Sequence, residues 1–165
     1  MNNLYRMAWV SSLVLSTVGS VAAQPLTMKW VCENATPPQP EPYGEGPRHS
    51  MRETPYSCTV NGGPFDGGAA TGINWWEAKG ADWSLLTGSG AIRKPPGGFA
   101  VFQHALGSLK VQLKDGKPTG YTAEGKGRFV TASGTAAQLS GKSYGWTLVS
   151  TGASTFEVSF QASGE

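Results

Sequence analysis

The chain has 165 residues, of which 39% are hydrophobic and 15% charged, and its formal net charge at pH 7 is +2. This length suits one ordinary domain, and the nearly balanced charge argues against a nucleic-acid partner held by bulk electrostatic attraction. The apolar content is too high for wholesale disorder, while 23 glycines and 11 prolines favour turns over a helical bundle. The composition therefore predicts a small all-β protein.

The first 23 residues have the order of a secretory signal peptide. Arg6 precedes an apolar stretch over residues 7–18, and small residues follow. We expect cleavage before Gln24, which leaves residues 24–165 as one domain in the periplasm or outside the cell. The apolar stretch is interrupted by serines and is shorter than the roughly 20 residues of a spanning helix. An integral membrane protein is therefore disfavoured.

Two cysteines, Cys32 and Cys58, are the only ones in the chain. In an oxidising compartment they are expected to form a disulfide that closes a loop of about 26 residues, worth roughly 3 kcal/mol on the chain-entropy model. The alternative, a catalytic or metal-binding thiol pair, lacks C-x-x-C spacing.

Before Cys58 the pattern changes from a strand to a proline-rich segment. Residues 26–32 alternate apolar and polar side chains, which predicts a half-buried strand. Five prolines follow within residues 36–47 and remove amide donors, so this segment cannot join a sheet interior. We expect residues 36–55 to form a Pro-rich excursion pinned at its ends by the disulfide.

The remaining chain repeats strand, glycine turn, strand, at a spacing of about ten residues. Asp115-Gly116 lies between two such runs and is the strongest hairpin signal, and residues 134–141 predict one helical turn. Such a meander leaves edges that closure into a barrel of about eight strands would cover. Candidate strands lie at 56–60, 70–79, 82–93, 98–104, 107–113, 120–131, 143–150 and 155–162.

The tract Gly125–Tyr144 resembles small secreted bacterial barrels. It contains a Gly-x-Gly strand, a glycine turn, a short helical turn and Gly-Lys before the next strand. This arrangement is similar to the allene oxide cyclase and dirigent type of lipocalin-like barrel. The resemblance implies an eight-stranded barrel whose calyx binds an apolar small molecule, and it assigns no catalytic residue to a position here.

Aromatic side chains are the best functional signal in the sequence. A barrel interior lined by Trp and Tyr can hold a flat apolar ligand, although such rings also simply fill cores. Trp75 and Trp76 point to opposite sides of one strand, so we expect one of them to lie away from the core unless the strand bulges. The candidate ligand-binding residues are Trp30, Trp75, Trp83, Phe129 and Trp146.

A catalytic set is harder to find. Glu77 shares its phase with Ile73 and Trp75, so we expect an apolar surrounding that raises its pKa and suits an acid or base. A paired, inert carboxylate at the barrel rim is the alternative. With Tyr121 and Tyr144, Glu77 would serve a cofactor-free cyclase or isomerase.

Metal and cofactor chemistry have little support. His49 and Met51 have a spacing that suits copper, and His104 and Met28 could complete a site only if the loop folded over the barrel mouth. A solvated loop is the simpler interpretation. The sequence has no P-loop, so no cofactor is expected.

Three functions remain open. The first is an exported barrel that binds a small apolar or aromatic molecule without catalysis, and the second is the cofactor-free isomerase. The third is a protein-interaction or inhibitor module that uses the 36–55 loop or an exposed Trp75 or Trp76.

Overall fold

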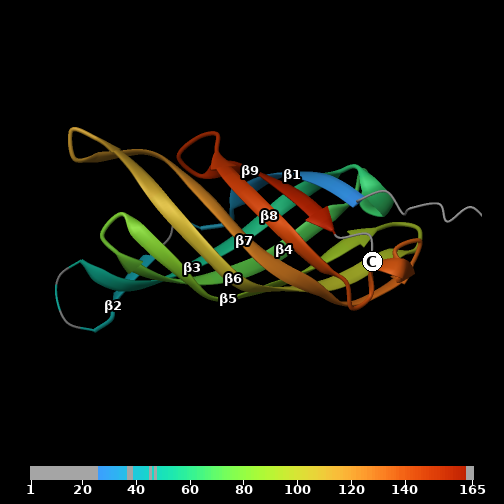
Figure 1. Cartoon of the computed structure of the whole chain (residues 1–165). Coiled ribbons are helices and arrows are strands. Elements are labelled where there is room, and N and C mark those ends of the chain that lie inside the picture. The colour runs from blue at the N-terminus through green and yellow to red at the C-terminus, as the bar shows by residue number, and fades with distance from the viewer. Residues whose placement is uncertain (1–25, 37–38, 45, 47, 163–165) are drawn as a thin grey trace, which may run out of the picture.

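The protein is a closed antiparallel β-barrel with one additional strand (Figure 1), which confirms the predicted fold class. This description comes from a computed structural model, in which residues 26–36, 39–44, 46 and 48–162 are described. Each strand from β3 to β9 pairs with the next, and β1 pairs with both β9 and β3, so that eight strands close the barrel. The strands are β1 (Leu26–Asn34), β2 (Gln39–Pro42), β3 (His49–Asn61), β4 (Ala69–Lys79), β5 (Asp82–Lys94), β6 (Gly98–Lys114), β7 (Lys117–Gly134), β8 (Ser143–Ser150) and β9 (Thr155–Ala162).

The disulfide lies on the seam that closes the barrel. Cys32 on β1 is directly opposite Cys58 on β3, and the two sulfurs are bonded, as predicted. The first half of β3 pairs instead with β2, which comes from the Pro-rich segment and is the edge strand among the described strands. Prolines 40 and 42 are tolerated there because an edge strand needs hydrogen bonds on one side only.

The predicted signal peptide, residues 1–23, and its cleavage site before Gln24 lie outside the described residues. Within the described ranges, no helix has the length and apolar character needed to cross a membrane.

The longest strands form the β6–β7 hairpin. Asp115 and Gly116 have positive φ angles of 53° and 75°, which confirms the predicted tight turn. The separate strands predicted at 98–104 and 107–113 are wrong, because β6 is continuous. A register shift between His104 and Leu106 marks a bulge. One extra residue there moves the inward-facing phase from even to odd positions without ending the strand.

One end of the barrel is closed by two short 3-10 helices, η1 (Gly63–Phe65) and η2 (Ala137–Leu139), at the right in Figure 1. Each contributes a buried apolar side chain, Phe65 and Leu139 respectively. The predicted helical turn within residues 134–141 is thus confirmed as η2.

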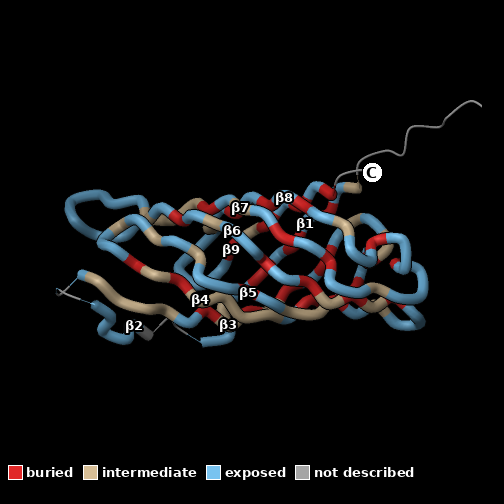
Figure 2. Tube along the Cα trace, turned by 60° about the horizontal axis from the view of Figure 1, so that its bottom comes forward, coloured by how far each residue is buried: buried red, intermediate tan, exposed pale blue. Residues whose placement is uncertain are grey.

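The middle of the barrel is filled by rings. Trp30 packs at 4.0 Å from Phe160 and at 5.3 Å from Phe102, measured between ring centroids. Figure 2 shows the buried residues concentrated from the middle of the barrel toward this closed end. The interior rings of this packed section belong to Trp30, Tyr56, Phe102, His104, Phe129, Tyr144, Trp146 and Phe160.

Glycines on neighbouring strands make room for these rings. A Cβ at Gly127 would lie 2.5 Å from the Tyr144 hydroxyl, and one at Gly125 would collide with the Trp146 indole. Rings packed over glycine backbone are a known way to fill a barrel and fix its register. The Gly-x-Gly tract of β7 is therefore explained by close approach of side chains.

Candidate functional site

The end of the barrel opposite η1 and η2 is hollow. A cavity of about 990 Å³ opens there among the turns that join β4 to β5 and β6 to β7. Its volume lies near the upper end of the usual range for small-molecule sites. The floor is formed by Thr54, Tyr56, Asn74, Trp76, Leu109, Leu148 and Phe156, and the upper wall includes Arg52, Trp83, Val111 and Tyr121.

Alternation along β3 and β4 brings polar groups to this floor. The Trp76 Nε1–H donates to the Thr54 hydroxyl at 3.1 Å, and that hydroxyl donates to the Asn74 carbonyl at 3.2 Å. The side-chain Oδ1 of Asn74 is buried and has no hydrogen-bond partner among the described residues. The floor is thus apolar with a few fixed polar atoms, one of which is unsatisfied.

A hydrogen-bonded chain lies beneath the floor. His104 Nε2 is 3.4 Å from the Tyr56 hydroxyl, and its Nδ1 is 3.2 Å from the Tyr144 hydroxyl. Tyr144 donates its proton to the Gln103 carbonyl at 3.3 Å. Its oxygen is then free to accept from Nδ1–H, which leaves Nε2 to accept from Tyr56. All three side chains are satisfied when His104 is neutral.

Burial sets the ionisation of this chain. It lowers the pKa of His104 to about 4, so the imidazole is neutral at pH 7. It raises the pKa of Tyr56 and of Tyr144, so both phenols stay protonated. Tyr56 also lines the cavity, so this chain connects the cavity floor to the packed section.

Arg52 brings a positive charge into the upper cavity. Its guanidinium carbon lies 4.8 Å from the centre of the Trp83 ring, and its Nε is buried without a hydrogen-bond partner among the described residues. Burial lowers the pKa of Arg52, but a guanidinium remains protonated at physiological pH. Among the described lining residues there is no carboxylate, and Arg48 at the exposed rim is the second charged side chain.

The predicted ligand-binding residues are divided between three locations. Trp83 lines the cavity, whereas Trp30, Phe129 and Trp146 are buried in the packed section. Trp75 alternates with the inward-facing Trp76 and lies on the outer face of β4. Prediction of one inward and one outward tryptophan is confirmed, with Trp76 as the inward one.

The predicted catalytic residues do not line one cavity. Tyr121 lies in the cavity wall, Tyr144 lies below the floor, and Glu77 is on the outer face of β4. The Glu77 carboxylate is 2.7 Å from His49 Nε2 and 3.0 Å from Lys79 Nζ.

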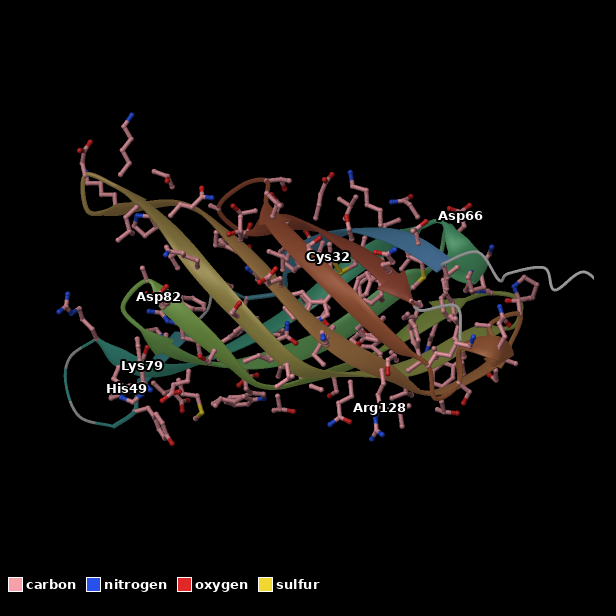
Figure 3. The ribbon with its side chains drawn as sticks, in the orientation of Figure 1. Cys32, His49, Asp66, Lys79, Asp82 and Arg128 are labelled. Carbon is pink, nitrogen blue, oxygen red and sulfur yellow. A yellow bond between two sulfur atoms is a disulfide. The ribbon has the colours of Figure 1, made fainter. Side chains whose placement is uncertain are left out.

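Figure 3 shows His49 and Lys79 together at the open end. Hydrogen bonds from Lys79 and His49 lower the pKa of Glu77, so the predicted rise is wrong. The apolar residues that share its phase face outward, where the side chains of His49 and Lys79 reach the carboxylate.

The four copper candidates are separated by the barrel wall. His49 contacts Glu77 outside, and Met51 faces the same side of β3. His104 lies inside between two tyrosines, and Met28 is buried near η1. The described residues contain no group of three His, Cys, Asp or Glu side chains that could hold a metal.

Sequence reasoning missed Arg52, Tyr56, Asn74 and Trp76 as a group. Arg52 was assigned to the Pro-rich excursion, although it alternates in phase with Thr54 and Tyr56. Extending the alternation of the 56–60 strand backwards by four residues would have placed Arg52 inside the barrel.

A second hollow of about 1300 Å³ lies on the outer wall, across β6 to β9 and β1. It is more open, and Gly145, an outward-facing position of β8, adds no side chain to it. The inner cavity is the better candidate site because strands surround it and fixed polar groups converge in it.

Comparison with known proteins supports the fold. No family model matches the chain, and no curated protein matches it. The crystal structure of a protein of unknown function from Clostridium acetobutylicum superimposes with a TM-score of 0.65 at 15% sequence identity. The match covers 85% of this chain and 97% of the other. At this identity the likeness shows a shared barrel and leaves function open.

Proposed function

We propose that this protein is an exported carrier or sensor that binds a small, largely apolar or aromatic molecule in the open end of the barrel, without catalysis. The observation that carries the proposal is the cavity of about 990 Å³ in a barrel whose middle and opposite end are filled by rings. A cavity lined by Trp76, Trp83 and Leu109 favours an apolar guest. Binding is favoured over catalysis because Glu77, Tyr121 and Tyr144 do not converge on the cavity.

The disulfide supports export, because such bonds persist in oxidising compartments. Mass spectrometry of the protein isolated gently from its host tests both the proposed export and the proposed ligand binding. Cleavage before Gln24 appears in the denatured mass, and a bound organic molecule appears as extra mass under native conditions.

Binding is tested directly with the neutral fluorescent probe N-phenyl-1-naphthylamine. We expect fluorescence to rise on binding to the wild-type protein. Val111→Trp, which places an indole inside the cavity, should weaken binding at least tenfold. Val149→Trp is the matched control, because Val149 is 55% exposed on the outer face of β8.

Failure of the probe to bind would contradict the proposal. If both substitutions weaken probe binding equally, or if neither weakens it, the probe binds outside the cavity. Either result would also contradict the proposal.

A further inference from the structure

We infer that the natural ligand of the cavity is an organic monoanion, of which a carboxylate on an aromatic or aliphatic body is the simplest form, and that Arg52 holds its charged group. This inference rests on the proposed function and specifies the chemical class of the ligand.

The first step is the charge balance of the cavity. Arg52 is half-buried and forms no ion pair among the described residues. Glu53, the next residue of β3, is exposed, and Glu77 on the paired strand β4 is bound by His49 and Lys79 on the outer face. Removing a guanidinium from water is costly without a compensating partner. An anionic ligand would supply that partner.

The second step is the geometry of the Arg52 donors. The guanidinium carbon of Arg52 lies over the Trp83 ring, 4.8 Å from its centre. A cation–π contact of this kind uses the face of the indole and none of the guanidinium N–H donors, so the donors can bind a carboxylate in a bidentate way. Trp83 therefore holds the Arg52 head group in the cavity without occupying its donors.

The third step is the position of Arg52 above the floor. Arg52, Thr54 and Tyr56 are successive inward-facing residues of β3, and the four-residue step from Arg52 to Tyr56 spans about 13 Å of strand. Below Arg52 the cavity is mainly apolar, and the Trp76 and Tyr56 donors are already engaged with Thr54 and His104. The charged group thus belongs near the mouth and the apolar body below it.

The charge of the ligand follows from the same residues. One half-buried guanidinium neutralises one negative charge. Arg48 is exposed at the rim, where solvent weakens its attraction. A dianion such as a phosphate monoester would leave one charge uncompensated in an apolar cavity.

The test measures dissociation constants by isothermal titration calorimetry for two matched pairs, 2-naphthoate with 2-naphthamide and decanoate with decan-1-ol. We expect the wild-type protein to prefer the anion at least tenfold in one pair or both, which corresponds to about 1.4 kcal/mol. Arg52→Met should reduce that ratio to near one. Arg128→Met, on the outer face of β7 away from the mouth (Figure 3), should leave it unchanged. Circular dichroism checks that each variant is folded.

Each outcome is decisive. Loss of the anion preference in Arg52→Met alone supports the inference. Equal affinity for both members of each pair overturns it while binding of N-phenyl-1-naphthylamine still supports the proposed function. A preference that survives in Arg52→Met, or tighter binding of 2-naphthyl phosphate than of 2-naphthoate, also overturns it. Absence of binding by all of these probes overturns both proposals.

Discussion

The packed half and the hollow half of the barrel are built from the same strands, yet only one of them is filled. In the packed half, β7 contributes Gly125 and Gly127, whose bare backbone is covered by the rings of Trp146 and Tyr144. In the hollow half, the same strand contributes Tyr121 to a wall around empty space. Figure 2 shows the corresponding change from buried residues to exposed and intermediate ones along the barrel.

The difference shows that barrel width alone does not decide whether a barrel is solid. An eight-stranded barrel is just wide enough to be filled by side chains or to hold one small ligand. Pairing a large ring with a glycine at the opposite position of the neighbouring strand produces the first result. Medium side chains such as Leu109 and Val111, which do not reach across, produce the second.

Truncation of a ring in the packed half should have the largest effect. Phe102 is fully buried, so Phe102→Ala should lower the free energy of unfolding by about 4 kcal/mol, through lost apolar burial and a new cavity. Val111 already faces a cavity, so Val111→Ala should cost less than about 1 kcal/mol. Urea unfolding with the disulfide intact measures both values. Similar costs would mean that the open end is packed in solution.

The buried imidazole should make stability depend on pH. The pKa of His104 is lowered from 6.5 in the unfolded chain to about 4 in the fold. Between pH 6.5 and pH 4 the His104 imidazole therefore binds a proton in the unfolded chain but stays neutral in the folded protein. Stability should fall as pH drops from 6.5 toward 4, by about 3 kcal/mol in total, and the contribution should level off below pH 4.

Other groups also titrate in this range, so the measurement is a difference between two proteins. His104→Gln keeps a hydrogen-bond donor and an acceptor between Tyr56 and Tyr144 but removes the imidazole, which is the group that titrates. Urea unfolding at pH 7, 5.5 and 4.5 should show a steeper decline for the wild-type protein than for the variant. Parallel curves would contradict the neutral, buried state of His104.

Sequence patterns predicted most of the barrel but only part of the site. The strands at 143–150 and 155–162 match β8 and β9, because their alternation is local and uninterrupted. The side on which a residue lies depends on features that alternation does not report. One example is the register shift opposite Trp75 and Trp76, where Leu86 is an extra residue and the inward-facing phase of β5 changes. The contact of Glu77 on β4 with His49 on β3 is another.

The cavity wall depends even more on tertiary structure. Arg52 follows a proline-rich segment and does not resemble part of a strand by composition, yet pairing with β2 and β4 extends β3 as far as His49. Long-range pairing placed this side chain inside the barrel. Composition favoured a loop there because prolines lack amide donors, but an edge strand requires few of them.

The smallest expected effect is the difference in the free energy of unfolding between alanine substitutions at two glycines of β7. A Cβ at Gly127 would lie 2.5 Å from the Gln103 carbonyl and from the Tyr144 hydroxyl, so Gly127→Ala should cost about 2 kcal/mol by overpacking. At Gly120, in the cavity wall, a Cβ meets the end of the Gln112 side chain at 3.2 Å, which can rotate away, and the Ser150 hydroxyl at 2.9 Å, which accepts a hydrogen bond from the Tyr121 N–H. Gly120→Ala should therefore cost no more than that one hydrogen bond, about 1 kcal/mol of the free energy of unfolding. Equal destabilisation in urea would mean that β7 needs glycine for backbone conformation at both positions, and ring packing would then not explain the solid half of the barrel.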